Sequence, residues 1–146
     1  SLPADIAICA AAVTDWFVVN AATQKQKKQS HVQPQIELAK NPDILASLSQ
    51  AASRPPLVIG FAAETEHLIG HDAKEKLEKK KCDWIIANYI SDDRSSVFGS
   101  DQNKASLLKG MDIIDWPYQS KQALAERLIV EIDQWIKAHD HSTETK

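Results

Sequence analysis

The chain has 146 residues, of which 43% are hydrophobic, and a formal net charge of −3. This length fits one domain that can bury a core, and the small net charge gives no general attraction to nucleic acid or membranes. The longest apolar stretch, Ile6–Val13, is too short to cross a bilayer, and no signal peptide is visible. We therefore expect a cytoplasmic protein without nucleic-acid or membrane partners. Cys9 and Cys82 lie in or beside apolar runs, which predicts free thiols rather than a disulfide framework.

The first predicted elements are a strand, a loop and an edge strand. The apolar run at residues 5–13 is typical of a strand covered on both faces, as in parallel sheets. Such a strand needs a neighbour on each side, and we expect one of them upstream of this chain. Residues 24–30 are polar and lysine-rich and predict a loop, whereas the alternation at 35–39 predicts a short edge strand. A helix start follows, with Asn41 as its cap and Pro42 at the first helical position.

The second half of the chain repeats the alternation of strands and helices. Residues 57–63 and 83–88 are predicted to be buried strands, separated by a helix over about 66–81 with a thin apolar side. A hairpin is predicted within 104–116. Ser120 can cap the last helix, whose apolar face consists of Leu124, Leu128, Ile132, Trp135 and Ile136.

This order predicts an α/β fold, a Rossmann-like parallel sheet flanked by helices, with a small antiparallel hairpin. We expect one domain over residues 1–138 and a polar tail over 139–146. Ligands of such sheets gather beyond the carboxyl ends of the strands. The residues just after Val13, Ala63 and Asn88 are therefore the first place to search for a site.

Basic residues cluster near these strand ends. Lys25, Lys27 and Lys28 place three positive charges within four residues, enough to help neutralise a polyphosphate, although a solvated loop explains the same pattern. Lys76 and Lys80 are four residues apart and share one face of the predicted helix. Neighbouring glutamates also fit an ordinary salt-bridged helix there.

Other features are compatible with a bound anion or nucleotide, but each also has an ordinary structural explanation. Residues 41–44 lie at a predicted helix N-terminus, where free N–H groups and the helix dipole favour an anion, or simply a capped helix. Phe61 can stack on a base or pack in the core. His67 and His71 lack the further ligands of a zinc site, so no metal site is predicted. The residues alone indicate an α/β domain with an anion or nucleotide site.

In combination, these segments resemble phosphopantothenoylcysteine synthetase. In bacteria this family is usually the C-terminal half of a bifunctional protein whose other half is a flavin-dependent decarboxylase. The resemblance runs from about residue 3 to residue 137. It is carried by Ala10–Trp16, Lys25-x-Lys27-Lys28, Asn41–Ile44, Gly60–Thr65, Lys76–Asp83 and Ala87-Asn88.

The resemblance implies a ligase that joins 4′-phosphopantothenate and L-cysteine with CTP. CTP activates the carboxylate as an acyl-cytidylate and releases pyrophosphate, and the cysteine amine then displaces CMP. Mg²⁺ is expected with the triphosphate. The family also implies a homodimer, for which the hairpin at 104–116 is a candidate contact. FMN is expected only where the full-length protein has a decarboxylase half.

The resemblance also assigns site residues. Lys25 takes the place of a lysine implicated in catalysis after activation. Phe17 and Tyr89 depart from the family pattern, which often has a basic residue and an acid at these positions. The implied nucleotide contacts are Ala11, Asp15, Lys25, Asn41, Pro42, Asp43, Ile44, Phe61, Lys76 and Lys80.

The family's domain opens with a glycine-bearing strand-loop-helix and an asparagine that handles the acyl-cytidylate, and neither is present in this chain. We therefore expect this chain alone to be inactive or nearly so. Two alternatives stay open. One is a relative that activates the acid with ATP, and the other is a non-catalytic dimerisation or interaction module.

Overall fold

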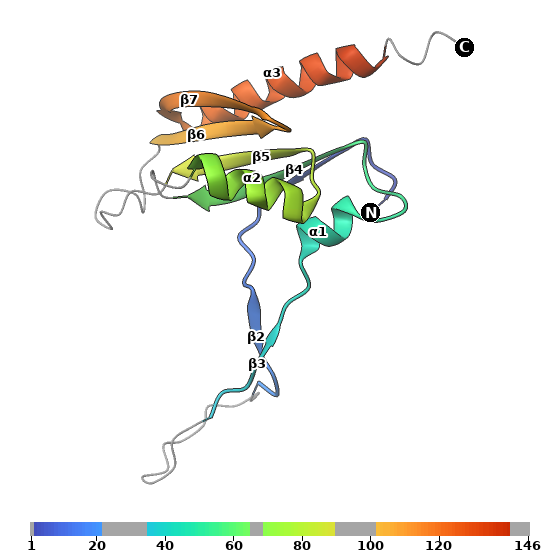
Figure 1. Ribbon diagram of the computed structural model, residues 1–146, viewed down its shortest axis with the longest axis vertical. Helices are drawn as coiled ribbons and strands as arrows, with labels where there is room; N and C mark the ends of the chain where they lie inside the picture. The colour runs from blue at the N-terminus through green and yellow to red at the C-terminus, as the bar shows by residue number, and fades with distance from the viewer. Residues whose placement is uncertain (1, 22–34, 65–68, 90–101, 141–146) are drawn as a thin grey trace.

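The computed structural model describes residues 2–21, 35–64, 69–89 and 102–140, without the side chains of 69–73 and 102. It contains seven strands and three helices in this part of the chain, and α2 follows β4 as predicted (Figure 1). In chain order they are β1 Ile6–Cys9, β2 Trp16–Val18, β3 Leu38–Lys40, α1 Ile44–Ser49, β4 Leu57–Glu64, α2 Ile69–Lys80, β5 Trp84–Tyr89, β6 Gln102–Lys109, β7 Asp112–Ser120 and α3 Lys121–Asp140.

Five strands form one mixed sheet in the order β1-β4-β5-β6-β7. β1, β4 and β5 are parallel, and the register places Glu64 beside Tyr89 at the carboxyl ends of β4 and β5. The predicted hairpin is β6 and β7, which add to the sheet as antiparallel strands and are longer than predicted. The Rossmann-like α/β prediction is therefore confirmed.

Alternate residues of the central strands bury opposite faces of the sheet. Leu57 and Ile59 point to the side covered by α3, whose Leu124, Leu128 and Ile132 are buried as predicted. Val58 and Ala62 point to the other side, where Leu77 of α2 packs. Because both faces are covered, β4 and β5 consist of almost uninterrupted apolar residues.

The first predicted strand is too long. β1 ends at Cys9, and residues 10–14 have no regular structure instead of continuing to Val13. Within the described residues, β1 pairs only with β4, and Ile8 is 45% exposed. The strand therefore lies at one edge of the sheet, and its apolar run does not predict where the pairing stops.

Beyond β1, strands β2 and β3 pair as an antiparallel ribbon, which we call the arm. It extends away from the body of the molecule (Figure 1). Trp16 lies opposite Lys40, and Val18 lies opposite Leu38. No strand was predicted at β2, and the edge strand predicted at 35–39 is displaced to Leu38–Lys40. Local alternation does not reveal a partner strand separated by about twenty residues.

The start of α1 also differs from the prediction. Asp43, not Asn41, is the N-cap, and Ile44 rather than Pro42 is the first helical residue. The Asp43 side chain accepts a hydrogen bond from the Ala46 N–H at 3.0 Å, which satisfies one of the free donors of the first turn. At the other end of the molecule, the Ser120 hydroxyl accepts from the Ala123 N–H at 3.0 Å, as expected for the cap of α3.

Helix α3 continues to Asp140 and so includes the first two residues of the polar tail predicted over 139–146. Both cysteines are free, Cys82 buried and Cys9 half-buried. Burial raises the pKa of the Cys82 thiol to about 11, so this thiol is neutral at physiological pH. Among the described residues, no helix combines the length and apolar character needed to cross a bilayer.

Candidate functional site

The carboxyl end of β4 carries a buried acid that pairs with one of the predicted lysines. Glu64 is only 5% exposed, and its Oε1 accepts a hydrogen bond from Lys76 Nζ at 2.5 Å. Lys76 lies in the middle of α2 and keeps 42% of its side-chain surface exposed. The strand end therefore presents a cation whose position is fixed by an acid beneath it.

One helical turn further along α2, Lys80 pairs with Asp43 at the start of α1. Both predicted lysines thus face the same side of the sheet, and each has a carboxylate partner. Partial burial favours the protonated form of Asp43, but hydrogen bonds from Lys80 and the Ala46 N–H outweigh it, so that the pKa of Asp43 is lowered. The anion site predicted at this helix start is occupied by the protein's own carboxylate.

Asn41 fastens the base of the arm. Its side-chain Nδ2 donates to the Thr14 carbonyl oxygen at 2.8 Å and lies 3.2 Å from the Thr14 hydroxyl oxygen. Its backbone N–H donates to the carbonyl oxygen of Asp15 at 2.8 Å. The predicted residues Asp15, Asn41, Asp43 and Lys80 therefore form a connected polar surface between the arm and α2.

The remaining predicted residues are less closely connected to this surface. Ala11 lies in the exposed segment after β1, and Pro42 and Ile44 are exposed on either side of Asp43. Phe61 is half-buried against the core on the α3 side, opposite the face that carries Lys76. Lys25 lies outside the described residues. The roles assigned to these residues therefore stay predictions.

A second polar group on the same face as Glu64 was not predicted. The hydroxyl oxygens of Tyr89 and the buried Ser106 are 3.1 Å apart, and the Ser106 hydroxyl donates to Asp115 at 2.5 Å. Lys104 Nζ lies 4.4 Å from the centre of the Tyr89 ring. Glu64 belongs to the Gly60–Thr65 motif, and no role was predicted for it either. An acid at the end of a buried strand is the one sequence signal that points to it.

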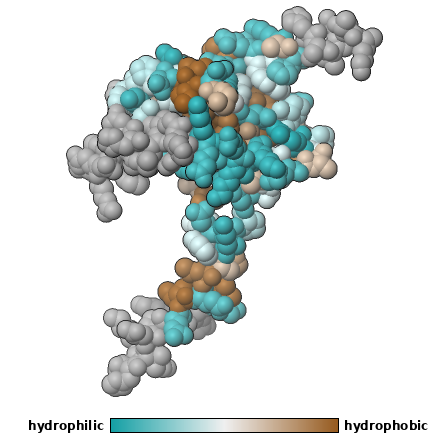
Figure 2. Space-filling view, in the orientation of Figure 1, coloured by the Kyte–Doolittle hydropathy of each residue, from teal (hydrophilic) through white to brown (hydrophobic). Residues whose placement is uncertain are grey.

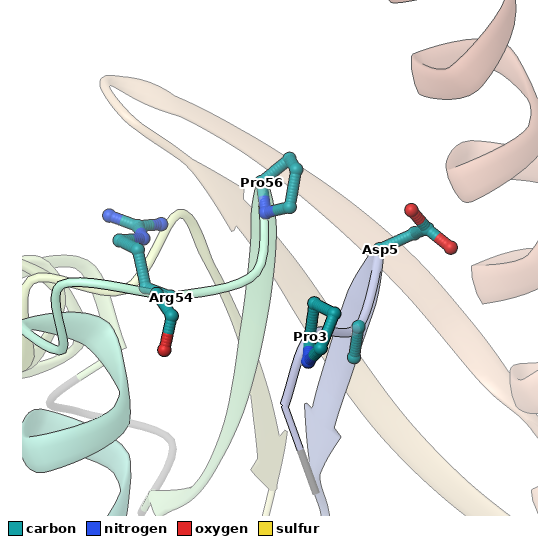
Figure 3. A pocket seen from close by; sticks show the side chains of 6 residues that line it. Pro3, Asp5, Arg54 and Pro56 are labelled. Atoms are coloured by element: carbon teal, nitrogen blue, oxygen red, sulfur yellow. The ribbon is translucent and has the colours of Figure 1, made fainter.

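Among the residues that the structure describes, neither a metal cluster nor the hollow at the edge of the sheet coincides with this surface. In the described part of the chain, no three His, Cys, Asp or Glu side chains are grouped to hold an ion, and the His67 and His71 side chains lie outside it. A hollow of about 410 Å³ lies at the opposite, amino-terminal edge of the sheet, between the start of β1 and the segment before β4 (Figure 3). Pro3, Asp5 and Arg54 line it. Arg54 is paired with Asp83.

The fold and the polar surface define the chain as an open-sheet α/β protein with a lysine-bearing helix packed on one face of the sheet. The family model described as the DNA/pantothenate metabolism flavoprotein C-terminal domain matches residues 1–136. The chain belongs to this family. That result confirms the resemblance found in the sequence.

Individual relatives agree with the family assignment. The chain is 39% identical over 127 residues to the coenzyme A biosynthesis bifunctional protein CoaBC of Haemophilus influenzae, covering 87% of this chain and 31% of that protein. It is 38% identical over 136 residues to CoaBC of Vibrio vulnificus, covering 92% and 33%. The chain thus spans about a third of these relatives. The crystal structure of a CoaBC C-terminal domain matches with a TM-score of 0.63 and 26% identity, covering 92% of this chain and 58% of that one.

Proposed function

We propose that this chain is the main part of a ligase domain that joins 4′-phosphopantothenate to L-cysteine in coenzyme A biosynthesis, with CTP as the activating nucleotide. The observation that carries the proposal is the family match over residues 1–136, together with relatives that are coenzyme A biosynthesis proteins. The pair of Glu64 and Lys76 at the carboxyl end of β4 supports it, because open α/β sheets bind their ligands beyond the carboxyl ends of the strands.

In the proposed reaction, a carboxylate oxygen of phosphopantothenate attacks the α-phosphorus of CTP, and pyrophosphate leaves. The cysteine amine then attacks the acyl carbon, loses a proton and displaces CMP. Lys76 and Lys80 would share the negative charge of the phosphates, while Lys25 would act in the second step. Asn41 joins Thr14 and Asp15 to the segment that starts α1, where Asp43 pairs with Lys80, so its role would be to keep these segments together.

Magnesium fits this arrangement as an ion that arrives with the triphosphate. Mg²⁺ is commonly held by one or two carboxylates and the phosphates rather than by a cage of protein ligands. Asp15 is exposed and is joined to Asn41 by a backbone hydrogen bond, whereas the carboxylate of Asp43 is already engaged by Lys80. Asp15 is therefore the described residue that we assign to the metal-bound nucleotide.

We also propose that the chain forms a homodimer through the arm. Trp16, Phe17 and Leu38 are 56%, 47% and 53% exposed, and hydrophobic residues gather on the arm in Figure 2. A two-stranded ribbon is marginally stable alone, and its unpaired edges can pair with the same ribbon of a second copy. The hairpin predicted as the contact is less suited, because β6 lies inside the sheet and its central residues are buried.

A pyrophosphate-release assay with CTP, 4′-phosphopantothenate and L-cysteine tests the proposed reaction. We expect turnover with CTP by the natural full-length protein, little turnover by this chain alone, and a large loss with Lys25→Gln in the full-length protein. Replacing CTP by ATP in the same assay separates the ATP-dependent alternative. A full-length protein that binds neither nucleotide would favour the non-catalytic interaction module.

A further inference from the structure

Glu64 is the only acidic residue among the buried side chains of the described part of the chain. Taking a carboxylate out of water costs several kcal/mol unless a partner compensates for the lost hydration. The partner here is Lys76 of α2, which lies twelve residues further along the chain than Glu64. The pair is asymmetric, because the acid is 5% exposed whereas the lysine side chain is 42% exposed.

This asymmetry leaves the ammonium group of Lys76 available to a second anion. An ammonium carries three N–H donors, and Glu64 accepts one of them. Glu64 lies beneath the lysine at the strand end, so it does not cover the solvent-facing side of Lys76. A lysine side chain has several rotatable bonds, and fixing it before a ligand arrives removes part of the entropic cost of binding.

We propose that Glu64 is a positioning residue that holds Lys76 at the carboxyl edge of the sheet, ready for the phosphates of the nucleotide. The inference rests on the proposed function, since it deepens the role of the nucleotide-binding surface. The neighbouring pair between Lys80 and Asp43 differs, because both partners are partly exposed, at 30% and 39%, and Asp43 also caps α1. Among the described residues, Lys76 is the one side-chain partner of Glu64.

A double-mutant cycle in the natural full-length protein tests this inference. The dissociation constant of CTP is measured by calorimetry for the wild type, Glu64→Gln, Lys76→Met and the double variant. We expect Glu64→Gln to weaken CTP binding roughly tenfold when Lys76 is present. In the Lys76→Met background the same substitution should have no further effect on the dissociation constant. Glu64→Asp, which keeps the charge, should restore part of the affinity. Asp133→Asn, which breaks the exposed pair with Lys137 on α3, is the matched control and should leave binding unchanged.

A second measurement reads the contact without any nucleotide. The rate of acetylation of Lys76, followed by mass spectrometry, should rise in Glu64→Gln because the ammonium group loses its partner. An unchanged rate would overturn the inference, and so would equal losses of CTP affinity with and without Lys76. Tighter CTP binding by Glu64→Gln would also overturn it, since the acid would then compete with the phosphates. If the wild type binds no CTP but the acetylation of Lys76 still rises in Glu64→Gln, the result would contradict the proposed function and not the contact between Glu64 and Lys76.

Discussion

The two carboxylate oxygens of Asp43 have different partners. Oδ1 accepts the Ala46 N–H and thereby starts α1, whereas Oδ2 accepts a hydrogen bond from Lys80 of α2. One side chain therefore fixes both the beginning of a helix and its position against the next helix. The sequence alone predicts a cap in this segment, but it assigns the cap to Asn41, because Asn and Asp have almost the same intrinsic preference for that position.

We expect Asp43→Asn to lower the free energy of unfolding by up to about 1 kcal/mol at neutral pH, because the ion pair with Lys80 and the negative charge at the helix start are lost, although Asn can still cap the helix. In the folded state the pKa of Asp43 is lowered from its ordinary value of 3.8. The contribution of the Asp43 charge to the free energy of unfolding is therefore complete above pH 3.8 and is lost as the pH falls further. Urea unfolding of both proteins between pH 2 and pH 6 measures this. A difference that stays constant down to pH 2 would contradict the assignment, and Asp133→Asn serves as the control.

At the scale of elements, Gly60 determines how closely α1 can approach β4. A Cβ atom at Gly60 would lie 2.5 Å from Cδ2 of Leu45, a separation that requires the leucine to move. The glycine of the Gly60–Thr65 motif therefore makes room for a helix. We expect Gly60→Val to destabilise the protein by about 1–3 kcal/mol through overpacking. In a Leu45→Ala background the same substitution should cost clearly less.

Thermal or urea unfolding of the four variants of this cycle gives the coupling between Gly60 and Leu45 directly. Additive losses would show that the contact does not limit the packing of α1. Since α1 begins at Asp43, displacement of the helix by Gly60→Val should also disturb the pair with Lys80.

The elements that the sequence predicts well are those whose signal is local. β4 and β5 are buried on both faces, so a continuous apolar run is sufficient to identify them, and α3 shows its apolar face at helical spacing. The arm is different, because β2 and β3 pair across a long intervening segment and expose their side chains.

The same limit applies to the site. The partners Glu64 and Lys76 are separated by 12 residues, and Asp43 and Lys80 by 37, so their pairing depends on the packed fold.

At the scale of the whole molecule, the arm determines the expected assembly. We expect the wild type to be a dimer by light scattering coupled to size exclusion, and the double variant Trp16→Ser/Leu38→Ser to shift toward the monomer. Ile129→Ser on α3, at a side chain that is 59% exposed, is the control and should not change the mass. A wild type that stays monomeric at micromolar concentrations would contradict the proposed dimer.

The predicted nucleotide contacts lie on both sides of one sheet. Phe61 belongs to the α3 side, whereas Lys76 and Lys80 extend from the helix on the other side. A single ligand that reached both would have to pass around the rim formed by the carboxyl-terminal part of β4, which extends beyond its last pairing with β1 at Gly60, with its base on one side and its phosphates on the other. Selectivity for the base and affinity for the phosphates would then depend on different residues. Substitutions on one side of the rim would change one of these two properties and leave the other unchanged.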